Sequence, residues 1–216
     1  MPCLGSYGKI SIFNTMKTAA WILFCMVCLM DMQAQPTLPH EQRYGLRLGA
    51  HYSLMNFNKG QPPLPQTVPN SWKPGLNIGF QLRFPVSEML GVQPEYFYTY
   101  MQGADERSGS DYQLHYLSLP VLLNMRVSER MSHMAGPQFG LLIHARQKTN
   151  GTVSNVTHDT EERSVSAVGA LQVHFTPAWY ADLRYVHGLN HIGLGQRSAV
   201  KEFKWQGVEL GVGYTW

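Results

Sequence analysis

The sequence predicts an all-β protein: an eight-stranded antiparallel transmembrane β-barrel with short periplasmic turns and long extracellular loops. Three observations lead to this prediction. Apolar and polar residues alternate with period two in eight segments of about ten residues, the length that a tilted strand needs to cross a bilayer. The connections between these segments are alternately long and short. Charged residues make up only 14% of the 216 residues, and no apolar run approaches the ~20 residues of a membrane helix.

The N-terminal part of the sequence is typical of a signal peptide. Lys17 precedes the apolar run Ala19–Met30, which is too short to span a bilayer but suits the central region of a signal peptide. A buried core helix is the alternative interpretation. We expect cleavage after Ala34, so that residues 1–34 are removed.

This cleavage would leave residues 35–43 as a short periplasmic segment and residues 44–216 as the barrel domain. Met16 is the expected true start of the protein, and residues 1–15 are then a mis-annotated start. All three cysteines precede Ala34, so the mature chain is expected to have no disulfide and no thiolate metal site. Export without cysteines is typical of a bacterial envelope protein.

The eight alternating segments follow one another along the chain. They are residues 44–54, 76–84, 92–100, 117–127, 135–146, 165–175, 179–185 and 207–216. In each segment the apolar residues share one face and the polar residues share the other. The first segment places Leu54 on the apolar face and His51 on the polar face. The fifth segment places His144 and Arg146 on the polar face.

The connections fix the orientation of the predicted barrel. Residues 85–90, 128–131 and 176–178 are short connections, and residues 55–75, 102–114, 147–164 and 189–205 are long and polar. Outer-membrane barrels have short periplasmic turns and longer external loops. An even number of strands puts both ends of the domain on the periplasmic side, which this order of connections requires.

Alternation alone does not say which face points inward. A soluble lipocalin-like barrel would place its apolar face around a ligand, whereas a membrane barrel places it against lipid. The low charge content and the aromatic residues at the strand ends favour lipid. The residues expected to form aromatic girdles are Phe84, Tyr98, Tyr100, Trp179, Tyr214 and Trp216.

The inward face would then carry charges of both signs in a narrow interior. Desolvation of an isolated ion costs several kcal/mol, so these charges are expected to pair. The predicted structural charge network comprises Arg47, Arg83, Glu95, Arg126, Asp182, Arg184 and Glu209. We expect each of the three acids to contact an arginine and the network to plug the barrel.

Several short motifs, taken in order, carry a family resemblance. They are YGLRLG at 44–49, PGLNIG at 74–79, LGVQPE at 90–95, YLSLPVLL at 116–123, AGPQFG at 135–140, DLRY at 182–185, GL at 188–189 and GVGY at 211–214. Together they resemble the PorT-like outer-membrane β-barrel family of Bacteroidetes, whose members contain an outer membrane protein beta-barrel domain. The resemblance covers nearly the whole mature chain.

The resemblance implies a location in the outer membrane of a Gram-negative cell, in contact with outer-membrane lipid. It also implies insertion by the barrel-assembly machinery, which reads a final strand ending in an aromatic residue, here Tyr214 and Trp216. Some members serve type IX secretion and gliding, so a secretion-system or surface protein is an expected partner. The resemblance supplies no catalytic residue.

The sequence contains no motif of nucleophilic, phosphate-binding, dinucleotide-binding or metalloprotease chemistry. We therefore predict no catalytic, cofactor-binding or metal-ligating residues. His187 and His191 are four residues apart, but they fall at a strand end and in a loop rather than on a helix. His51, His144 and His174 are expected to pack in the lumen. A net charge of +3 without clustered Lys and Arg excludes nucleic acid as a partner.

The leading functional prediction is a non-enzymatic outer-membrane barrel, structural or accessory to an envelope or type IX secretion-like assembly. A small pore is one alternative, although the interior of eight strands is just filled by side chains. A lipid-modifying barrel enzyme is another, with His133 or His187 at the membrane rim. A soluble ligand-binding barrel is the last alternative.

Overall fold

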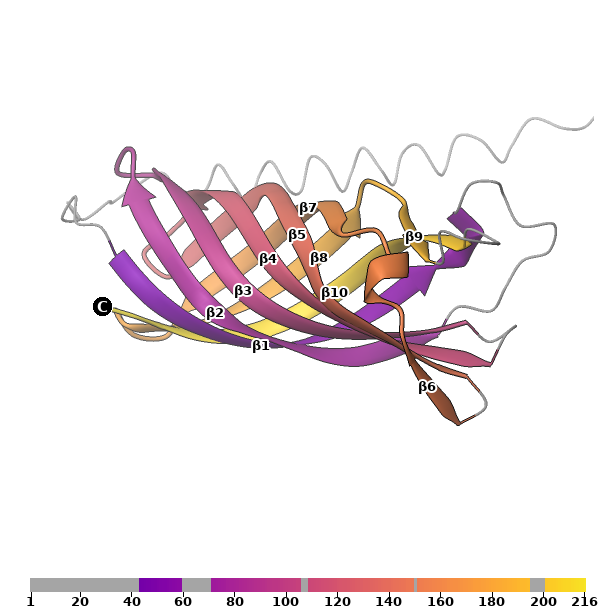
Figure 1. Cartoon of the computed structure of the whole chain (residues 1–216). Coiled ribbons are helices and arrows are strands. Elements are labelled where there is room, and N and C mark those ends of the chain that lie inside the picture. The colour runs from indigo at the N-terminus through magenta and orange to yellow at the C-terminus, as the bar shows by residue number, and fades with distance from the viewer. Residues whose placement is uncertain (1–42, 60–70, 106–108, 150, 195–200) are drawn as a thin grey trace, which may run out of the picture.

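The structure is a computed structural model that describes residues 43–59, 71–105, 109–149, 151–194 and 201–216. Within these residues eight long strands form one closed antiparallel barrel (Figure 1). They are β1 (Arg43–Asn56), β2 (Trp72–Pro85), β3 (Leu90–Asp105), β4 (Ser110–Arg126), β5 (Met131–Thr149), β7 (Arg163–His174), β8 (Trp179–Gly188) and β10 (Lys201–Thr215). They pair in sequence order, and β1 also pairs with β10, which closes the barrel. The predicted fold class is confirmed.

Four short elements complete the described part of the chain. β6 (Thr152–Asn155) pairs with β5, and β9 (Ile192–Leu194) pairs with β10. The 3-10 turns η1 (Phe57–Lys59) and η2 (Thr157–Asp159) follow β1 and β6. No helix in the described residues has the length and apolar character needed to cross a membrane. The predicted signal peptide at 1–34, the start at Met16 and the segment up to residue 42 lie outside the described residues.

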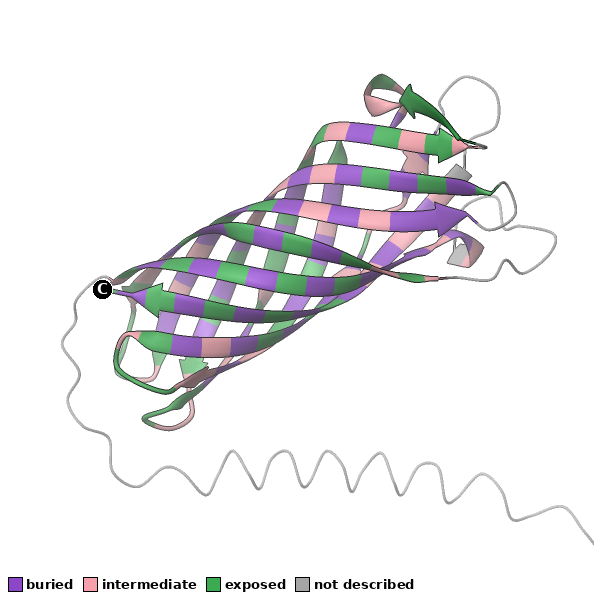
Figure 2. Ribbon diagram, turned by 90° about the horizontal axis from the view of Figure 1, so that it is seen from below, coloured by how far each residue is buried: buried purple, intermediate pink, exposed green. Residues whose placement is uncertain are grey.

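Inward and outward residues alternate along most of each barrel strand, as the bands of burial in Figure 2 show. In β1, Arg47 is 1% exposed while Leu48 is 59% exposed. In β2, Asn77 is 2% exposed while Ile78 is 55% exposed. The apolar face therefore points out of the barrel and the polar face points into it, as predicted. A large outward apolar surface is what a lipid environment stabilises.

The three short connections lie at the same end as Arg43 and Trp216, and we refer to it as the periplasmic end. Each connection contains a hydroxyl that accepts hydrogen bonds from backbone N–H groups of the turn. Ser87 accepts from Leu90 at 3.1 Å, Ser128 from Met131 at 3.2 Å and Thr176 from Trp179 at 2.9 Å. Such turns let a strand reverse within a few residues, which keeps this end compact.

At the opposite, external end the strands are longer than predicted. β3, β4 and β5 contain 16, 17 and 19 residues, well beyond the 9–11 or so that a membrane strand needs. Residues 102–114 were expected to be one long loop, but β3 continues to Asp105 and β4 begins at Ser110. The expected loops 147–164 and 189–205 likewise contain β6, β9 and the start of β10. The reason is that alternation continues there, with Tyr112 and Leu114 packed inside the barrel.

A bulge in β5 reverses the facing that was predicted for the residues after it. Tyr116 of β4 is opposite Leu142, but the preceding His115 is opposite His144, so Ile143 is an extra residue in β5. An extra residue sends every later side chain to the opposite face. Ala145 is therefore fully buried, whereas Arg146 is exposed and His144 is only partly buried. The prediction that His144 and Arg146 face the lumen is wrong.

Candidate functional site: the barrel lumen

The central part of the lumen contains a buried ion-pair network of five residues: Arg47, Arg184, Glu95, Asp182 and Glu209. Arg47 donates to Asp182 through both Nε and Nη2, each at 2.7 Å, and its Nη2 lies 3.4 Å from Glu209 Oε2. Arg184 donates through both terminal nitrogens to Glu95, with Nη2 at 2.9 Å from Oε1, and through Nε to Asp182 at 2.9 Å. Each predicted acid therefore contacts an arginine.

The strand register explains why these residues meet. Glu209 of β10 lies opposite Arg184 of β8, and Asp182 lies opposite Gly211. Gly211 provides space for Arg47, since a Cβ at this glycine would lie 2.6 Å from Arg47 Nε. The guanidinium of Arg47 can therefore pass over β10 from β1 and reach Asp182 on β8. Bidentate contacts of this kind fix the geometry of a guanidinium and a carboxylate.

Amide and hydroxyl side chains extend this network toward the periplasmic end. Gln93 donates to Glu95 at 2.7 Å, and Tyr180 donates to Gln81 at 2.6 Å. Further bonds join Arg47 to Asn77, Gln93 to Gln81, and Asn124 to Gln93 and Gln172. The connected polar groups come from every barrel strand except β5.

Sequence reasoning missed the contribution of these amide residues and of Phe97. The ring of Phe97 lies near both guanidinium groups, with its centroid 5.3 Å from Arg47 Cζ and 5.5 Å from Arg184 Cζ. A cation near an aromatic ring is attracted by the ring quadrupole. The sequence did indicate that Phe97 faces inward, because it lies two residues from Glu95 in an alternating strand.

Beyond this network, toward the external end, most of the large side chains in the lumen are apolar. They belong to one buried cluster, which continues to Leu122 and Met134 beside the network and otherwise comprises Met55, Phe57, Met101, Tyr112, Leu114, Tyr116, Ala145, Val168, Val186, Ile192, Leu194, Phe203 and Trp205. Phe57 of η1 packs against Phe203 at a centroid distance of 5.6 Å. Leu54 was expected to face outward, but it is 8% exposed, because alternation stops at Ser53 where β1 leads into η1. The external half of the lumen is thus filled by side chains.

Arg83 and Arg126, two expected members of the network, do not join it. Neither forms an ion pair with a carboxylate among the described residues. Glu95 lies opposite Gln81, two residues from Arg83, and both of its oxygens are bound to Arg184. Arg126 lies still closer to the periplasmic end, at the last residue of β4. Their side chains are therefore too far along the barrel axis to share the central acids.

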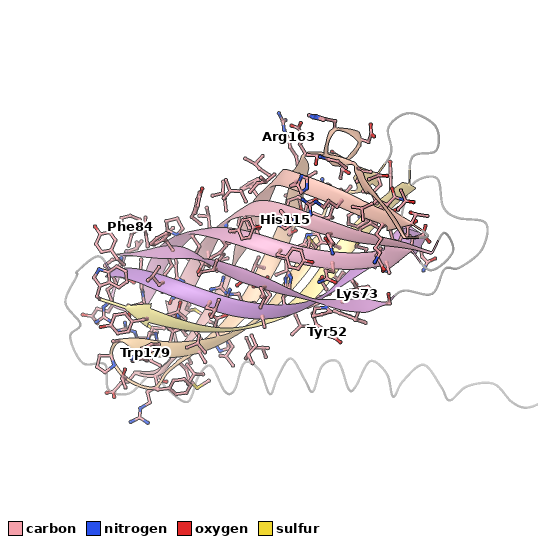
Figure 3. The ribbon with its side chains drawn as sticks, turned by 60° about the horizontal axis from the view of Figure 1, so that its bottom comes forward. Tyr52, Lys73, Phe84, His115, Arg163 and Trp179 are labelled. Atoms are coloured by element: carbon pink, nitrogen blue, oxygen red, sulfur yellow. The ribbon has the colours of Figure 1, made fainter. Side chains whose placement is uncertain are left out.

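The outer surface carries aromatic residues near both ends of its apolar band (Figure 3). Phe84 and Trp179 lie at the periplasmic end, where Trp179 contacts Tyr214 edge-on at 5.1 Å. Nearer the external end, the Tyr98 hydroxyl lies 2.6 Å from His115 Nδ1. Aromatic residues at these levels suit the two headgroup regions of a bilayer. Tyr100 is half-buried rather than fully outward and packs against the His115 ring.

Tyr214 and Trp216, the residues of the predicted assembly signal, lie on the outer surface at the closing seam. Their rings stack at a centroid distance of 6.2 Å. The backbones of Trp216 and Tyr44 exchange two hydrogen bonds, at 2.9 and 3.3 Å, so the last residues pair with the start of β1.

The described histidines have several different surroundings. His51 is buried in the lumen with Nε2 at 2.9 Å from the Tyr100 carbonyl, and His174 packs on the Tyr180 ring. His187 contacts Tyr185 and Gln206. Among the residues that the structure describes, no group of three or more His, Cys, Asp or Glu is arranged to hold a metal ion.

Comparisons with known proteins agree with this geometry. The family described as outer membrane protein beta-barrel domain matches residues 33–193. Neisserial surface protein A has a similar structure, with a TM-score of 0.51 and 12% identity, over 79% of this chain and 96% of that chain. Ail of Yersinia pestis (TM-score 0.46, 18% identity, 82% and 99% covered) and OprG from Pseudomonas aeruginosa (0.47, 11%, 82% and 97%) are also similar. No curated protein sequence matches significantly.

At 12% identity the likeness to Neisserial surface protein A shows the fold alone, a small closed β-barrel. The family match adds the location, because it covers most of the chain. The chain therefore belongs to the outer membrane protein beta-barrel domain family and resides in the outer membrane.

Proposed function

We propose that this protein is a closed, non-enzymatic scaffold of the outer membrane, structural or accessory to an envelope or type IX secretion-like assembly. The finer assignment, to the PorT-like barrels of Bacteroidetes, is part of the same proposal and rests on the sequence motifs. In this proposal outer-membrane lipid surrounds the barrel, and the barrel-assembly machinery inserts it through the strand that ends in Tyr214 and Trp216.

The observation that carries the proposal is the filled lumen. Arg47, Arg184 and their three acid partners connect strands on opposite sides of the barrel, and the apolar cluster extends from beside this network through the external half. Arg47 and Arg184 are 1% and 2% exposed. Neighbouring polar groups that neutralise one another leave little driving force for water to enter, and an apolar core excludes water. This arrangement favours a plug over a diffusion pore.

Planar-bilayer recording tests the closed state. We expect the refolded wild-type barrel to give no steady conductance, while a general diffusion porin in the same bilayer serves as the positive control. A steady, large conductance from the wild-type barrel would contradict the scaffold proposal and favour the small pore.

Incubation with lipopolysaccharide tests the non-enzymatic part of the proposal. We expect the mass of the lipid to stay unchanged in the presence of the folded barrel. An acyl chain gained or lost would favour a lipid-modifying enzyme, and replacing His187 or His133 would then locate the activity.

The external end offers the contact surface for an assembly partner. The β5–β6 hairpin extends from the barrel, and all four residues of β6 are exposed, including Val153 at 60% (Figure 1). A photo-crosslinking residue at Val153 should capture an envelope protein in living cells. The matched position Leu210 is 63% exposed on the outward face of β10, and there only lipid adducts are expected. Protein adducts absent at Val153, or equal at both positions, would argue against a partner at this hairpin.

A further inference from the structure

Three arginines gather at the periplasmic mouth of the lumen: Arg43, Arg83 and Arg126, referred to below as the mouth arginines. Arg43 and Arg83 are directly opposite each other in the β1–β2 register. Each lies two residues beyond an inward position, Gly45 and Gln81 respectively, so both side chains share the inward face. Arg126 of β4 lies two residues beyond the fully buried Asn124 and therefore points the same way.

The mouth arginines extend across the opening rather than away from it. Arg83 lies over Gly91 of β3, where an added Cβ would be 3.6 Å from Arg83 Nε, so its guanidinium reaches from β2 toward β4. Arg43 Nη1 lies 3.4 Å from the carbonyl oxygen of Pro177 in the turn between β7 and β8. The mouth arginines therefore extend over an opening that is formed by several strands.

Within the part of the chain that the structure describes, no carboxylate pairs with these three charges. In the central network two arginines share three carboxylates, whereas the mouth arginines form no ion pair with any carboxylate among the described residues. The nearby turn acids Glu88 and Glu129 are exposed and form no ion pair with them. Arg43, Arg83 and Arg126 lie near enough for their like charges to repel one another, and His174 lies within range of the same charges. Like charges opposite each other in a sheet are destabilising, so the arrangement favours a bound anion.

We propose that the mouth arginines form a binding site for a phosphate group that enters from the periplasm, carried by a free phosphate or by a phospholipid headgroup. Planar guanidinium groups bind phosphate oxygens through paired hydrogen bonds. A phosphate group offers several oxygens, which suits donors that come from three strands, β1, β2 and β4. A phosphoryl dianion would also neutralise more of the three charges than one carboxylate does. The site is independent of the closed state of the barrel and of any assembly partner.

The first test measures binding of pyrophosphate and inorganic phosphate to the refolded mature barrel by isothermal titration calorimetry in a phosphate-free zwitterionic detergent. Arg83→Gln and Arg126→Gln should each weaken pyrophosphate binding about tenfold, as expected for the loss of one charge-assisted contact. The control is Arg163→Gln, because Arg163 is exposed at the external end of β7 and has the same charge. Wild-type binding that is absent, or equal weakening by the control, would overturn the proposal.

The second test separates a ligand site from a structural role. Without phosphate, Arg83→Gln should raise the thermal midpoint of unfolding, because it removes the repulsion opposite Arg43. Added pyrophosphate should raise the midpoint of the wild type and leave that of Arg83→Gln unchanged. A lower midpoint for Arg83→Gln, with no response of the wild type to pyrophosphate, would show that the mouth arginines only stabilise the fold.

The third test identifies the source of the phosphate. Wild-type barrel and the double variant Arg83→Gln, Arg126→Gln are extracted from outer membranes and compared by native mass spectrometry. A phospholipid retained by the wild type and lost from the double variant assigns the site to a headgroup. Pyrophosphate binding without a retained lipid assigns it to a soluble phosphate compound. Neither lipid nor pyrophosphate on the wild type overturns the proposal.

Discussion

Replacing Arg47 by methionine should destabilise the barrel more than any other single change in the lumen. In the wild type, Arg47 and Arg184 together face three carboxylates. Without Arg47, Arg184 is the one arginine left for three carboxylates and pairs with Glu95 and Asp182, while Glu209 keeps as its ion-pair contact only the His51 imidazole, at 3.9 Å, which is charged only when protonated. Removing one partner of a buried ion pair costs about 3–5 kcal/mol. We expect the free energy of unfolding to fall by this amount, because both side chains of the Arg47–Asp182 pair are fully buried.

Urea unfolding of the barrel in lipid vesicles, followed by tryptophan fluorescence, measures this loss. Glu209→Gln is the matched control, because it leaves two arginines against two carboxylates and should change stability by less than about 1 kcal/mol. Adding Asp182→Asn to Arg47→Met reduces the excess negative charge and should recover part of the loss. A smaller loss for Arg47→Met than for Glu209→Gln would refute the charge-balance reasoning.

The remaining predictions concern space, lipid and processing. Gly211→Ala should disrupt the Arg47–Asp182 contact and lower the thermal midpoint of unfolding, because the added Cβ would lie 2.6 Å from Arg47 Nε. Gly169→Ala is the control and should leave the midpoint unchanged, because its Cβ would meet nothing within 4 Å. Leu210→Arg should impair insertion by about 2–4 kcal/mol if residue 210 lies near the midplane of the bilayer, and a heat-modifiability gel measures the assembled fraction. Ser154→Arg in exposed β6 is the control and should assemble normally. Equal assembly of the two variants would contradict contact between Leu210 and lipid. N-terminal sequencing of membrane-extracted protein should start at Gln35, and full-length protein in the cytosol would exclude export.

Much of the barrel could be predicted because alternation and turn composition are local signals. The turns at Ser87, Ser128 and Thr176 follow directly from short polar breaks between alternating segments. The bulge at Ile143 could not be located in this way. Leu141, Leu142 and Ile143 are all apolar, so the sequence does not show where the facing changes.

The lumen was only partly predictable, because its contacts depend on closure of the barrel. The residues on the polar face of each strand could be assigned to the lumen. Which of them form pairs could not, because Glu95 and Arg184, for example, belong to strands that are not neighbours in the sheet. Pairs across the barrel therefore cannot be deduced from strand order alone. The apolar cluster did leave a signal: Leu122 and Leu123 are adjacent apolar residues in β4, and only one of them can face lipid.

The seam between β1 and β10 has a consequence for the order of assembly. Arg47 and Asp182 are 135 positions apart, and Arg47 and Glu209 are 162 positions apart. Contacts between such distant residues form late, because closing so large a loop costs entropy before any contact is gained. Until β1 meets β10, an open sheet would carry unpaired strand edges and uncompensated charges, neither of which hydrocarbon tolerates. Entry into the bilayer and closure of the seam should therefore be one concerted step, with neutralisation of the lumen charges as its final event.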